Sequence, residues 1–460
     1  MTTIISRHRG ILTAGVMILT AAIIGGCSNF QDRLLAAPDP DVINPSSVNS
    51  AAGAEAMRIG ALSRLRNITA GGEGAWMLGG LLADEWKSGD TFLQRNETDQ
   101  RIIQENNANV QGMMREIYRV RTSAREALGV LKSFVPGTPA YQGQMYWSMA
   151  IAEVTLAESF CNGTPLGDAS TGAPVYGPPL TNQAVFQLAL AHADSAVTLA
   201  SGTDATSTAI RNAAAVTKAR IQLALGQFTN VAATVSAVPT SFQHLATFAL
   251  TSGDNQIWSL NTSQKRWVVG DSFDVGGRIT NALPFASSGD PRVKVTGNSS
   301  ASSPAGKAFD GSTSFISLLN FGRSESTPIV SGLDARLYEA EALLQANNYT
   351  GMMTVLNGLR AAPPNLGTFT PAAMAALGAP ADRNAAIDVY FREKAFWTFG
   401  RGQRLGDLRR LVRQYGRAQA NVFPSGQFFK GGSYGSDVNF PVTVDEQNNP
   451  DFKGCIDRNA

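Results

Sequence analysis

The chain has few of the residues that build catalytic or metal centres. Its 460 residues include only three histidines and three cysteines. Apart from His8 near the N-terminus, the histidines are His192 and His244, and they lack the spacing of a metal-ligand set. No Gly-x-Ser-x-Gly elbow and no phosphate-binding glycine loop ending in Lys-Ser/Thr is present. The sequence therefore predicts no metal, no cofactor and no enzyme activity, with a hydrolase left open only if residues 239–332 carry an acid pair.

The chain also lacks an excess of charge of either sign. It has 38 Lys and Arg residues against 36 Asp and Glu residues. Without Arg7 and Arg9, which lie in the N-terminal segment that we expect to be cleaved, it has 36 of each. Proteins that bind nucleic acid carry a basic face or stripe. The composition therefore gives no reason to expect a nucleic acid partner.

No apolar run is long enough to span a bilayer, which takes about 20 residues. The longest, residues 11–24, follows a short basic start and leads into Ile24-Gly25-Gly26-Cys27. That tetrapeptide resembles the bacterial lipobox, in which the cysteine is lipidated and becomes the mature N-terminus. We expect residues 1–26 to be a lipoprotein signal peptide, Cys27 the lipid-attachment site and residues 27–46 a tether. An ordinary signal peptide with a chance cysteine is the alternative.

Position 28 also bears on the destination. It is Ser28 and not the aspartate typical of retention at the inner membrane, which favours the outer membrane.

Beyond Cys27, only Cys161 and Cys455 remain. Two thiols in an oxidising compartment favour a disulfide, and two buried free thiols are the alternative.

Helical periodicity dominates most of the chain. Apolar residues recur at helical spacing, and turn residues separate the segments. The predicted helices cover residues 47–68, 75–86, 110–134, 141–160, 182–200, 207–226, 227–237, 333–346, 349–361, 383–399 and 403–415. Four pairs of consecutive helices are predicted to form helix hairpins: 110–160, 182–226, 333–361 and 383–415. Stacked hairpins of this kind predict a mainly α, tetratricopeptide-like scaffold with degenerate repeats.

The composition changes between the two helical regions. Residues 239–332 are rich in Gly, Ser, Asn and Asp and carry short alternating runs, which predicts a variable insert of loops and short strands. The expected organisation is thus N-terminal helical hairpins at 47–238, the insert at 239–332, and C-terminal helical hairpins with an irregular tail at 333–460.

Five blocks of sequence resemble the SusD/RagB family of lipoproteins. They are LLADEW at 81–86, MAIAE at 149–153 with FCNGTPL at 160–166, LYEAEA at 337–342 with LNGLR at 356–360, REKAFW at 392–397 with Gly400, Arg404 and DLRR at 407–410, and Phe440-Pro441 with Glu446 and Asn449-Pro450. Their order spans nearly the whole mature chain. The insert matches least, and the tether lacks an acidic run linked to surface export in some members.

The resemblance implies a SusD-like fold and a role in nutrient capture. Members of the family sit at the outer membrane, lipid-anchored and surface-exposed, over a TonB-dependent, SusC-like transporter. They bind oligosaccharides, or in some cases peptides, and are not enzymes. The implied function is therefore capture of a glycan, with a peptide as the second choice. A helical-repeat scaffold lipoprotein that assists outer-membrane assembly is the alternative.

Sugar binding predicts aromatic rings on loops, with polar side chains beside them for the hydroxyls. Two regions provide these residue types: the loop after residue 86, which matches a segment of the glycan site in some family members, and the insert. The candidates are Trp86, Phe92, Arg95, Trp258, Trp267, Phe273, Arg278 and Phe285. Packing within the insert is the alternative role for each ring, whereas Trp76, Trp147 and Trp397 are expected in the core.

A cluster of arginines near the C-terminus needs its own interpretation. Arg401, Arg404, Arg409, Arg410 and Arg413 lie close to Asp407. One interpretation is that the cluster forms an anion-binding site. We expect instead a structural block in which the arginines lie on a solvated helix face and pair with Asp407 and its neighbours.

Overall fold

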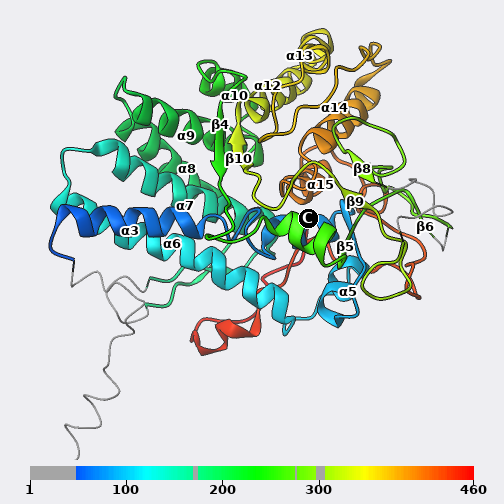
Figure 1. Cartoon of the computed structure of the whole chain (residues 1–460), viewed down its shortest axis with the longest axis horizontal. Coiled ribbons are helices and arrows are strands. Elements are labelled where there is room, and N and C mark those ends of the chain that lie inside the picture. The colour runs from blue at the N-terminus through cyan, green and yellow to red at the C-terminus, as the bar shows by residue number, and fades with distance from the viewer. Residues whose placement is uncertain (1–47, 169–174, 275–276, 297–305) are drawn as a thin grey trace, which may run out of the picture. The chain divides into compact units, whose positions relative to one another are not determined.

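The computed structural model describes residues 48–168, 175–274, 277–296 and 306–460. The predicted signal peptide, Cys27 and the tether lie outside these residues. The compact body runs from Ser50 to Ala460. It consists mainly of helices joined by loops and short strands (Figure 1), which confirms the predicted mainly α fold. Within the described ranges, no helix has both the length and the apolar content needed to cross a membrane.

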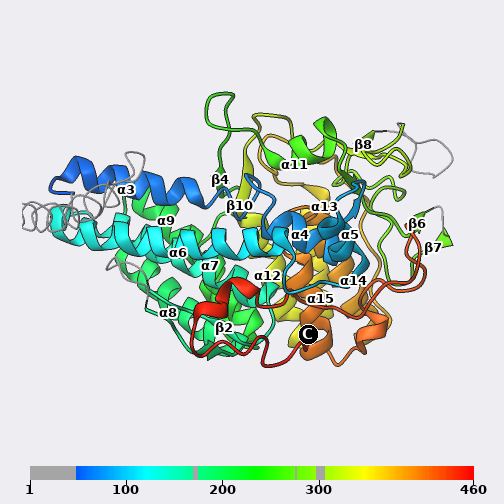
Figure 2. The ribbon, with the colours of Figure 1, turned by 90° about the horizontal axis from the view of Figure 1, so that it is seen from below.

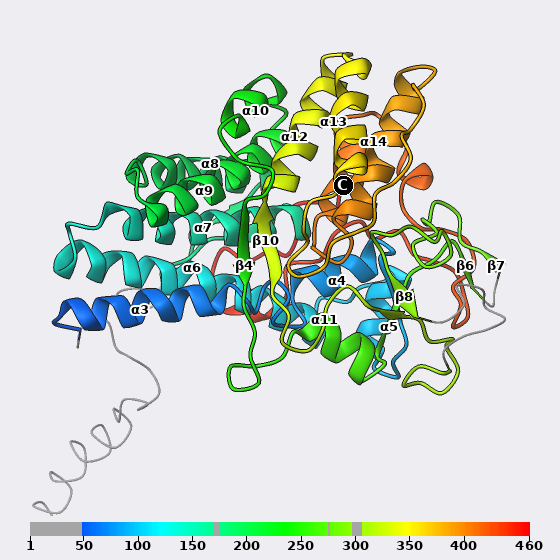
Figure 3. The same cartoon turned by 45° about the horizontal axis from the view of Figure 1, so that its top comes forward.

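The first half of the body is a stack of helices. These are α3 (Ala51–Arg64), α6 (Ala108–Phe134), α7 (Pro139–Ser159), α8 (Asn182–Leu199), α9 (Ala205–Ala224) and α10 (Phe228–Val235). Each helix packs on the next one in this order (Figure 3). Side chains of Asn107, Thr181 and Asp204 cap the first turns of α6, α8 and α9, because such side chains accept hydrogen bonds from N–H groups that have no helical partner.

Helix α7 lies at the centre of this stack. Nearly all of its side chains are buried, as expected for a helix that is apolar on all sides. Trp147 of α7 donates its indole N–H to Oγ1 of Thr217 in α9 at 2.9 Å. Trp76, Trp147 and Trp397 are all almost fully buried, in agreement with their predicted place in the core.

The C-terminal helices include one correction. They are α12 (Gly332–Gln345), α13 (Tyr349–Ala361), α14 (Arg383–Trp397) and α15 (Arg404–Arg413). Helices α12 and α13 form the predicted hairpin. Helix α14 packs instead against α12, while α15 packs against α7 and α4 (Ala75–Leu82). The hairpin predicted at 383–415 is therefore wrong, because each of its helices is held by a different earlier helix.

The segment between the helical regions is joined to both of them by short strands. Strand β4 (Gln243–Ala246) pairs antiparallel with β10 (Thr327–Ser331), directly before α12. Strand β5 (Trp267–Val269) pairs antiparallel with β1 (Trp86–Ser88), directly after α4. The insert thus covers the loop that follows residue 86. Between β4 and β5 lie α11 (Gln256–Trp258) and the π-helix η2 (Ser259–Ser263).

The remaining strands are two-residue pairs. They are β2 (Thr164–Pro165) with β3 (Pro179–Leu180), β6 (Phe273–Asp274) with β7 (Gly277–Arg278), and β8 (Val295–Thr296) with β9 (Ser317–Leu318). Two α-helices were not predicted: α11, in the insert expected to hold loops and short strands, and α5 (Leu93–Gln100). The sequence of α5, LQRNETDQ, has no apolar period and gives no pattern to detect.

The C-terminal tail is tied back to the end of α7. A disulfide joins Cys161 and Cys455, whose Cα atoms are 5.9 Å apart. Beside it, Asn162 and Asp457 form an isolated β-bridge, and Asn162 also donates to the Asp457 carboxylate. Figure 2 shows the tail, in red, next to β2. The tail therefore returns to the helical stack instead of trailing from the body.

The arginine cluster is buried, which corrects the expected solvated helix face. Arg401, Arg404, Arg409 and Arg410 are each at most 6 % exposed, and only Arg413 is exposed. A charge is tolerated in the interior only when it is paired and hydrogen-bonded. Arg401 and Arg410 are paired with the carboxylates of Asp334 and Glu341, whereas Arg404 and Arg409 donate to backbone carbonyls of distant segments.

Two examples show how the cluster holds the fold together. Arg401 donates Nη1 and Nη2 to the two carboxylate oxygens of Asp334, at 3.0 and 2.7 Å. Arg409 Nη1 donates to the carbonyls of Ala157, Glu158 and Phe160, at 2.8–3.0 Å. It thereby satisfies the last carbonyl groups of α7, which lack helical partners. The structural role of the block is correct, and its solvent exposure was wrong.

Candidate ligand-binding surface

The structure divides the predicted aromatic candidates into buried and exposed rings. Trp86, Trp267 and Phe285 are fully buried. The ring of Trp86 packs against Phe399 at 5.0 Å between centroids. A Cβ at Gly80 would come within 2.5 Å of the Trp86 ring, so the indole is enclosed on that side. The prediction that these three rings contact a ligand is wrong in this structure, because none presents a face to solvent.

Three other candidates lie on separate elements of the insert. Trp258 is half-buried at the end of α11, with the guanidinium of Arg323 5.7 Å from its ring centroid. Phe273 and Arg278 are exposed and oppose each other in the β6–β7 pair. This ring and this cation share one small hairpin without further aromatic contact among the described residues.

Phe92 and Arg95 come together with residues of the insert to form a surface. Phe92 precedes α5 and is 49 % exposed, and Phe309 of the insert is 50 % exposed. The guanidinium carbon of Arg266 lies 5.0 Å from the centroid of Phe92 and 3.7 Å from that of Phe309. We call Phe92, Phe309 and the groups that fix them the Phe92–Phe309 surface. It presents two half-exposed rings that both lie against one arginine.

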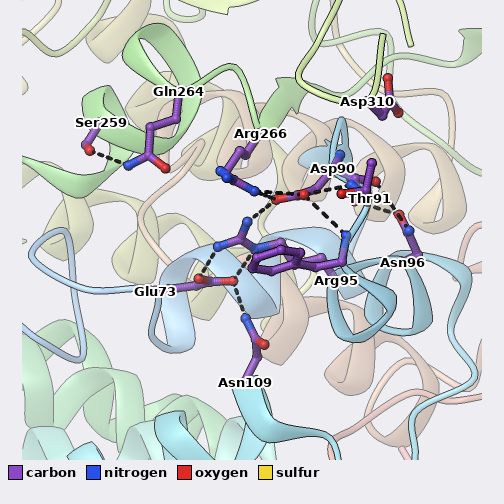
Figure 4. A network of polar contacts seen from close by, with 12 residues as sticks. Glu73, Asp90, Thr91, Arg95, Asn96, Asn109, Ser259, Gln264, Arg266 and Asp310 are labelled. Atoms are coloured by element: carbon purple, nitrogen blue, oxygen red, sulfur yellow. Dashed lines mark hydrogen bonds and ion pairs between the residues drawn. The ribbon is translucent and has the colours of Figure 1, made fainter. Parts of the chain in front are cut away.

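The carboxylate of Asp90 organises the polar layer of this surface (Figure 4). It is fully buried and accepts hydrogen bonds from Arg95 Nη1 and from Arg266 Nη1, the latter at 2.9 and 2.8 Å. It also accepts from the backbone N–H groups of Thr91 and Phe92. Burial by itself would raise the pKa of Asp90, but the hydrogen bond from Arg266 and the charge of Arg95 outweigh it and lower the pKa.

Arg95 is held on its other edge by Glu73. Its Nε and Nη2 donate to the two oxygens of Glu73 at 2.6 and 2.5 Å. Asn109 donates to the same carboxylate at 2.5 Å. Every nitrogen of the Arg95 guanidinium is thus bonded, and the residue is 5 % exposed. Arg95 was predicted to contact a ligand; its geometry makes it a support for Asp90.

The C-terminal tail closes the surface from the third side. Lys430 Nζ donates to the carbonyl of Asp90 at 2.6 Å and to Asn96 Oδ1 at 3.0 Å, and it lies 2.9 Å from Asp310 Oδ2. Burial would raise the pKa of Asp310, but hydrogen bonds from Thr313 and Lys430 lower it well below its usual value. The loop after β1, the insert and the tail are therefore locked together by charged hydrogen bonds.

Sequence reasoning missed Phe309. It lies in the segment Gly306–Gly311, where isolated aromatic residues carry no periodic pattern. Its backbone N–H donates to the carbonyl of Lys265 at 2.9 Å, which places it beside Arg266. Only this long-range contact identifies it, so a single sequence offers no direct sign of its role.

A concave region is present on the helical side of the body. A hollow of about 710 Å³ lies between α12, α13 and the loops near Thr240 and Asn365. Its other lining residues include Arg336, Glu339 and Val355, and none of the lining residues is aromatic. The Phe92–Phe309 surface is the better candidate for a sugar, because it combines exposed rings with fixed polar groups.

The two histidines occupy structural positions. His192 Nδ1 lies 2.7 Å from the buried carboxylate of Glu153. His244 in β4 packs edge-on against Trp147, and burial lowers its pKa to about 4. Across the described ranges, no group of three His, Cys, Asp or Glu side chains is arranged to hold a metal ion.

Comparison with known proteins supports the fold. No protein-family model and no curated protein matches the chain. A solved SusD superfamily protein from Parabacteroides distasonis is 13% identical, with a TM-score of 0.63, and the match covers 89% of this chain and 100% of that one. A SusD/RagB family protein from Bacteroides thetaiotaomicron is 12% identical, with a TM-score of 0.61 over 86% and 94% of the two chains.

A third solved structure carries a functional description. It is a candidate sugar-binding protein from Bacteroides vulgatus, 13% identical, with a TM-score of 0.58 over 90% of this chain and 99% of that one. At these identities the likeness establishes the fold and not the ligand. The chain has the SusD-like fold that its sequence blocks predicted.

Proposed function

We propose that this protein is a SusD/RagB-type outer-membrane lipoprotein that captures an oligosaccharide on the Phe92–Phe309 surface and passes it to a TonB-dependent, SusC-like transporter. Two observations support the proposal. The fold is SusD-like over nearly the whole chain, and two half-exposed rings lie against an arginine that a buried carboxylate holds. The second observation carries the choice of site.

The physical basis is preorganisation. A phenyl ring offers a flat apolar face to the C–H groups of a pyranose, while fixed polar groups beside it take hydroxyl hydrogen bonds. Phe92 and Phe309 are held by Arg266, and Arg266 is held by a buried carboxylate. Immobilising a side chain on binding costs about 0.5–1.5 kcal/mol. Groups that are already fixed avoid most of this cost, so a small contact area can still give useful affinity.

The binding test uses the soluble chain from Ser28 onward. A screen against glycans and peptides should return a glycan, and Phe309→Ala or Phe92→Ala should weaken its binding at least tenfold, which is about 1.4 kcal/mol. Because both rings are half-exposed, we expect the melting temperature to change little. Phe273→Ala is the matched control, since Phe273 is 57 % exposed on another hairpin.

Several results would contradict the proposal. Equal loss of affinity in Phe273→Ala and Phe309→Ala would remove the surface as the site. Binding of peptides alone would replace the glycan as ligand. No binding in the screen, together with loss of many barrel proteins on depletion of this chain, would favour the assembly-scaffold alternative.

The anchor and the partner are part of the same proposal. Replacement of Cys27 by Ser should release the protein from the membrane fraction, and intact mass analysis of the wild type should show acyl chains on a chain beginning at Cys27. A multiply acylated cysteine anchors firmly, because each buried CH₂ contributes about 0.8 kcal/mol. Purification from membranes should co-isolate a TonB-dependent barrel. An unlipidated wild-type chain or a consistently absent barrel would overturn these two parts.

A further inference from the structure

The two arginines of the Phe92–Phe309 surface differ in how their donors are used. Arg95 has all three guanidinium nitrogens bonded to Glu73 and Asp90. Arg266 uses only Nη1, which donates to both oxygens of Asp90. Its Nε and Nη2 donate to no residue in the described part of the chain. One complete edge of the Arg266 guanidinium is therefore unused.

This unused edge reaches solvent in a fixed orientation. The Arg266 side chain is 18 % exposed. Its Nε and Nη2 are both accessible to solvent, since neither is among the buried polar atoms that lack a partner. The guanidinium is planar, so fixing Nη1 on Asp90 and stacking the plane on Phe309 also fixes the direction of the opposite edge. In Figure 4 the bonded nitrogen of Arg266 faces Asp90 and the rest of the group points away from it.

The rest of the chain shows what this edge binds when it is occupied. In four other arginines, Nε and Nη2 donate together to the two oxygens of one carboxylate. The pairs are Arg58 with Glu55, Arg95 with Glu73, Arg220 with Glu158, and Arg292 with Asp290. Such two-point pairs are the strong form of the arginine–carboxylate interaction. The vacant edge of Arg266 has the same geometry and lacks the carboxylate.

The local charge also favours an anion. The polar layer is balanced, because Glu73, Asp90 and Asp310 face Arg95, Arg266 and Lys430. Two further cations belong to the same segments of the chain: Lys265 and Lys307 are exposed, with Nζ near the Phe315 ring and on the Ser312 carbonyl respectively, and no ion pair involves either of them in the described ranges. Lys265 is adjacent to Arg266 and is hydrogen-bonded through its carbonyl to Phe309. The segments that carry Arg266 and Phe309 thus hold two cations without a carboxylate partner among the described residues.

We infer that the ligand is an acidic oligosaccharide, and that Arg266 binds the carboxylate of a uronic acid residue through Nε and Nη2 while Phe309 and Phe92 contact the sugar rings. This inference rests on the proposed function and makes it more specific. Arg266 selects the acidic unit, and Arg95 is a positioning residue that keeps Asp90 in place.

The test compares ligands that differ only at the carboxylate. The soluble chain from Ser28 onward is screened against oligosaccharides of galacturonic, glucuronic, mannuronic and guluronic acid, each also as its methyl ester, and against neutral glycans. We expect an acidic form to bind at least tenfold more tightly than its ester. In Arg266→Gln this ratio should fall to about one, because the amide cannot form the two-point charged pair.

The ester comparison needs no variant, so a folding defect cannot hide the answer. Arg266→Gln should nevertheless fold, since Asp90 keeps its bonds to Arg95 and to two backbone N–H groups. Arg323→Gln is the control, because Arg323 is an exposed insert arginine paired with Asp254 elsewhere; it should leave the ratio unchanged.

The outcomes separate this inference from the proposed function. Phe309-dependent binding of neutral glycans alone, or of acid and ester with equal affinity, would overturn the acidic ligand and leave glycan capture intact. An acid-to-ester ratio that survives in Arg266→Gln would overturn the role of Arg266. Binding of an acidic peptide with no glycan binding would overturn both.

Discussion

Glu85 is the clearest place to test how burial controls the stability of this fold. Its side chain is fully buried next to Trp86. One carboxylate oxygen accepts the Gly400 N–H at 3.2 Å, and the other has no partner among the described residues. Burial raises the pKa of Glu85 to about 8, and the Arg404 charge and the Gly400 N–H offset this only in part. The folded protein therefore holds a proton that the unfolded chain releases near pH 4.

The sign and size of the effect follow from proton linkage. A raised carboxyl pKa gives stability that is complete below the unfolded pKa and is lost as pH rises through the folded pKa. Each pH unit in that window costs about 1.4 kcal/mol per proton. From about pH 4.5 to about 8, Glu85 alone should cost on the order of 3–5 kcal/mol. Asp99, whose pKa burial raises to about 7, adds to the same slope.

The perturbation is Glu85→Gln, which keeps the shape and the oxygen that accepts the Gly400 N–H. Urea unfolding of the disulfide-intact soluble chain, measured from pH 5 to pH 9, should show similar stability at pH 5 and a more stable variant at pH 9. The carboxylates with lowered pKa, such as Asp90, change stability only below about pH 4. They do not interfere in this window.

A matched substitution checks the chemistry of the change. Glu105 is exposed, so Glu105→Gln makes the same replacement at a hydrated site and should reproduce the wild-type curve. The reasoning is refuted if the Glu85→Gln curve runs parallel to the wild-type curve from pH 5 to pH 9. That result would mean that Glu85 is already ionised in the folded protein.

Three further predictions concern stability. Trp86→Ala should lower the free energy of unfolding by about 3–5 kcal/mol in urea titrations, because the ring is fully buried; a loss below 1 kcal/mol would place it outside the core. Replacing Cys161 and Cys455 together by Ser should cost about 2–5 kcal/mol and lower the calorimetric melting temperature, and an unchanged temperature would argue against the bond. Arg401→Met should cost about 3–5 kcal/mol by leaving Asp334 buried without its cation, and adding Asp334→Asn should recover part of the loss, which a purely steric effect would not allow.

The helical scaffold could be predicted because its information is local. Apolar spacing and capping residues such as Thr181 lie within each segment, and the observed helices begin and end within a few residues of the predicted positions. Helix α5 could not be predicted, because Leu93–Gln100 is polar throughout. Contacts with neighbouring segments hold it in place instead of an apolar face of its own: Asp99 accepts the Ser88 N–H, and Asn107 donates to the Gln94 carbonyl and to the Glu97 carboxylate.

The candidate site was predicted only in part, because burial depends on contacts between distant segments. Trp86 and Trp267 have the same residue type and loop setting as sugar-stacking rings. They are buried because β1 pairs with β5, which places Trp86 opposite Val269 and Trp267 opposite Ser88. Phe309, by contrast, is 50 % exposed, and only its backbone bond to Lys265 places it beside Arg266. Sequence reasoning identified Phe92 as a candidate. It could not tell which aromatic side chains of the two candidate regions are exposed and which are buried.

The contrast between donors enclosed in the fold and donors open to solvent separates scaffold from site in this protein. In the buried C-terminal block, Arg401 uses all three guanidinium nitrogens on Asp334 and the Pro328 carbonyl, and Arg409 bonds the end of α7 through Nη1 while its Nε stays buried. Arg95 also uses all three of its nitrogens, one layer below the surface. Arg266 is anchored as firmly through Asp90 but keeps a complete edge unused beside two half-exposed rings. Unlike the unbonded Nε of the buried Arg409, this edge is fixed in place and open to solvent, which are the two features that binding an acidic sugar requires.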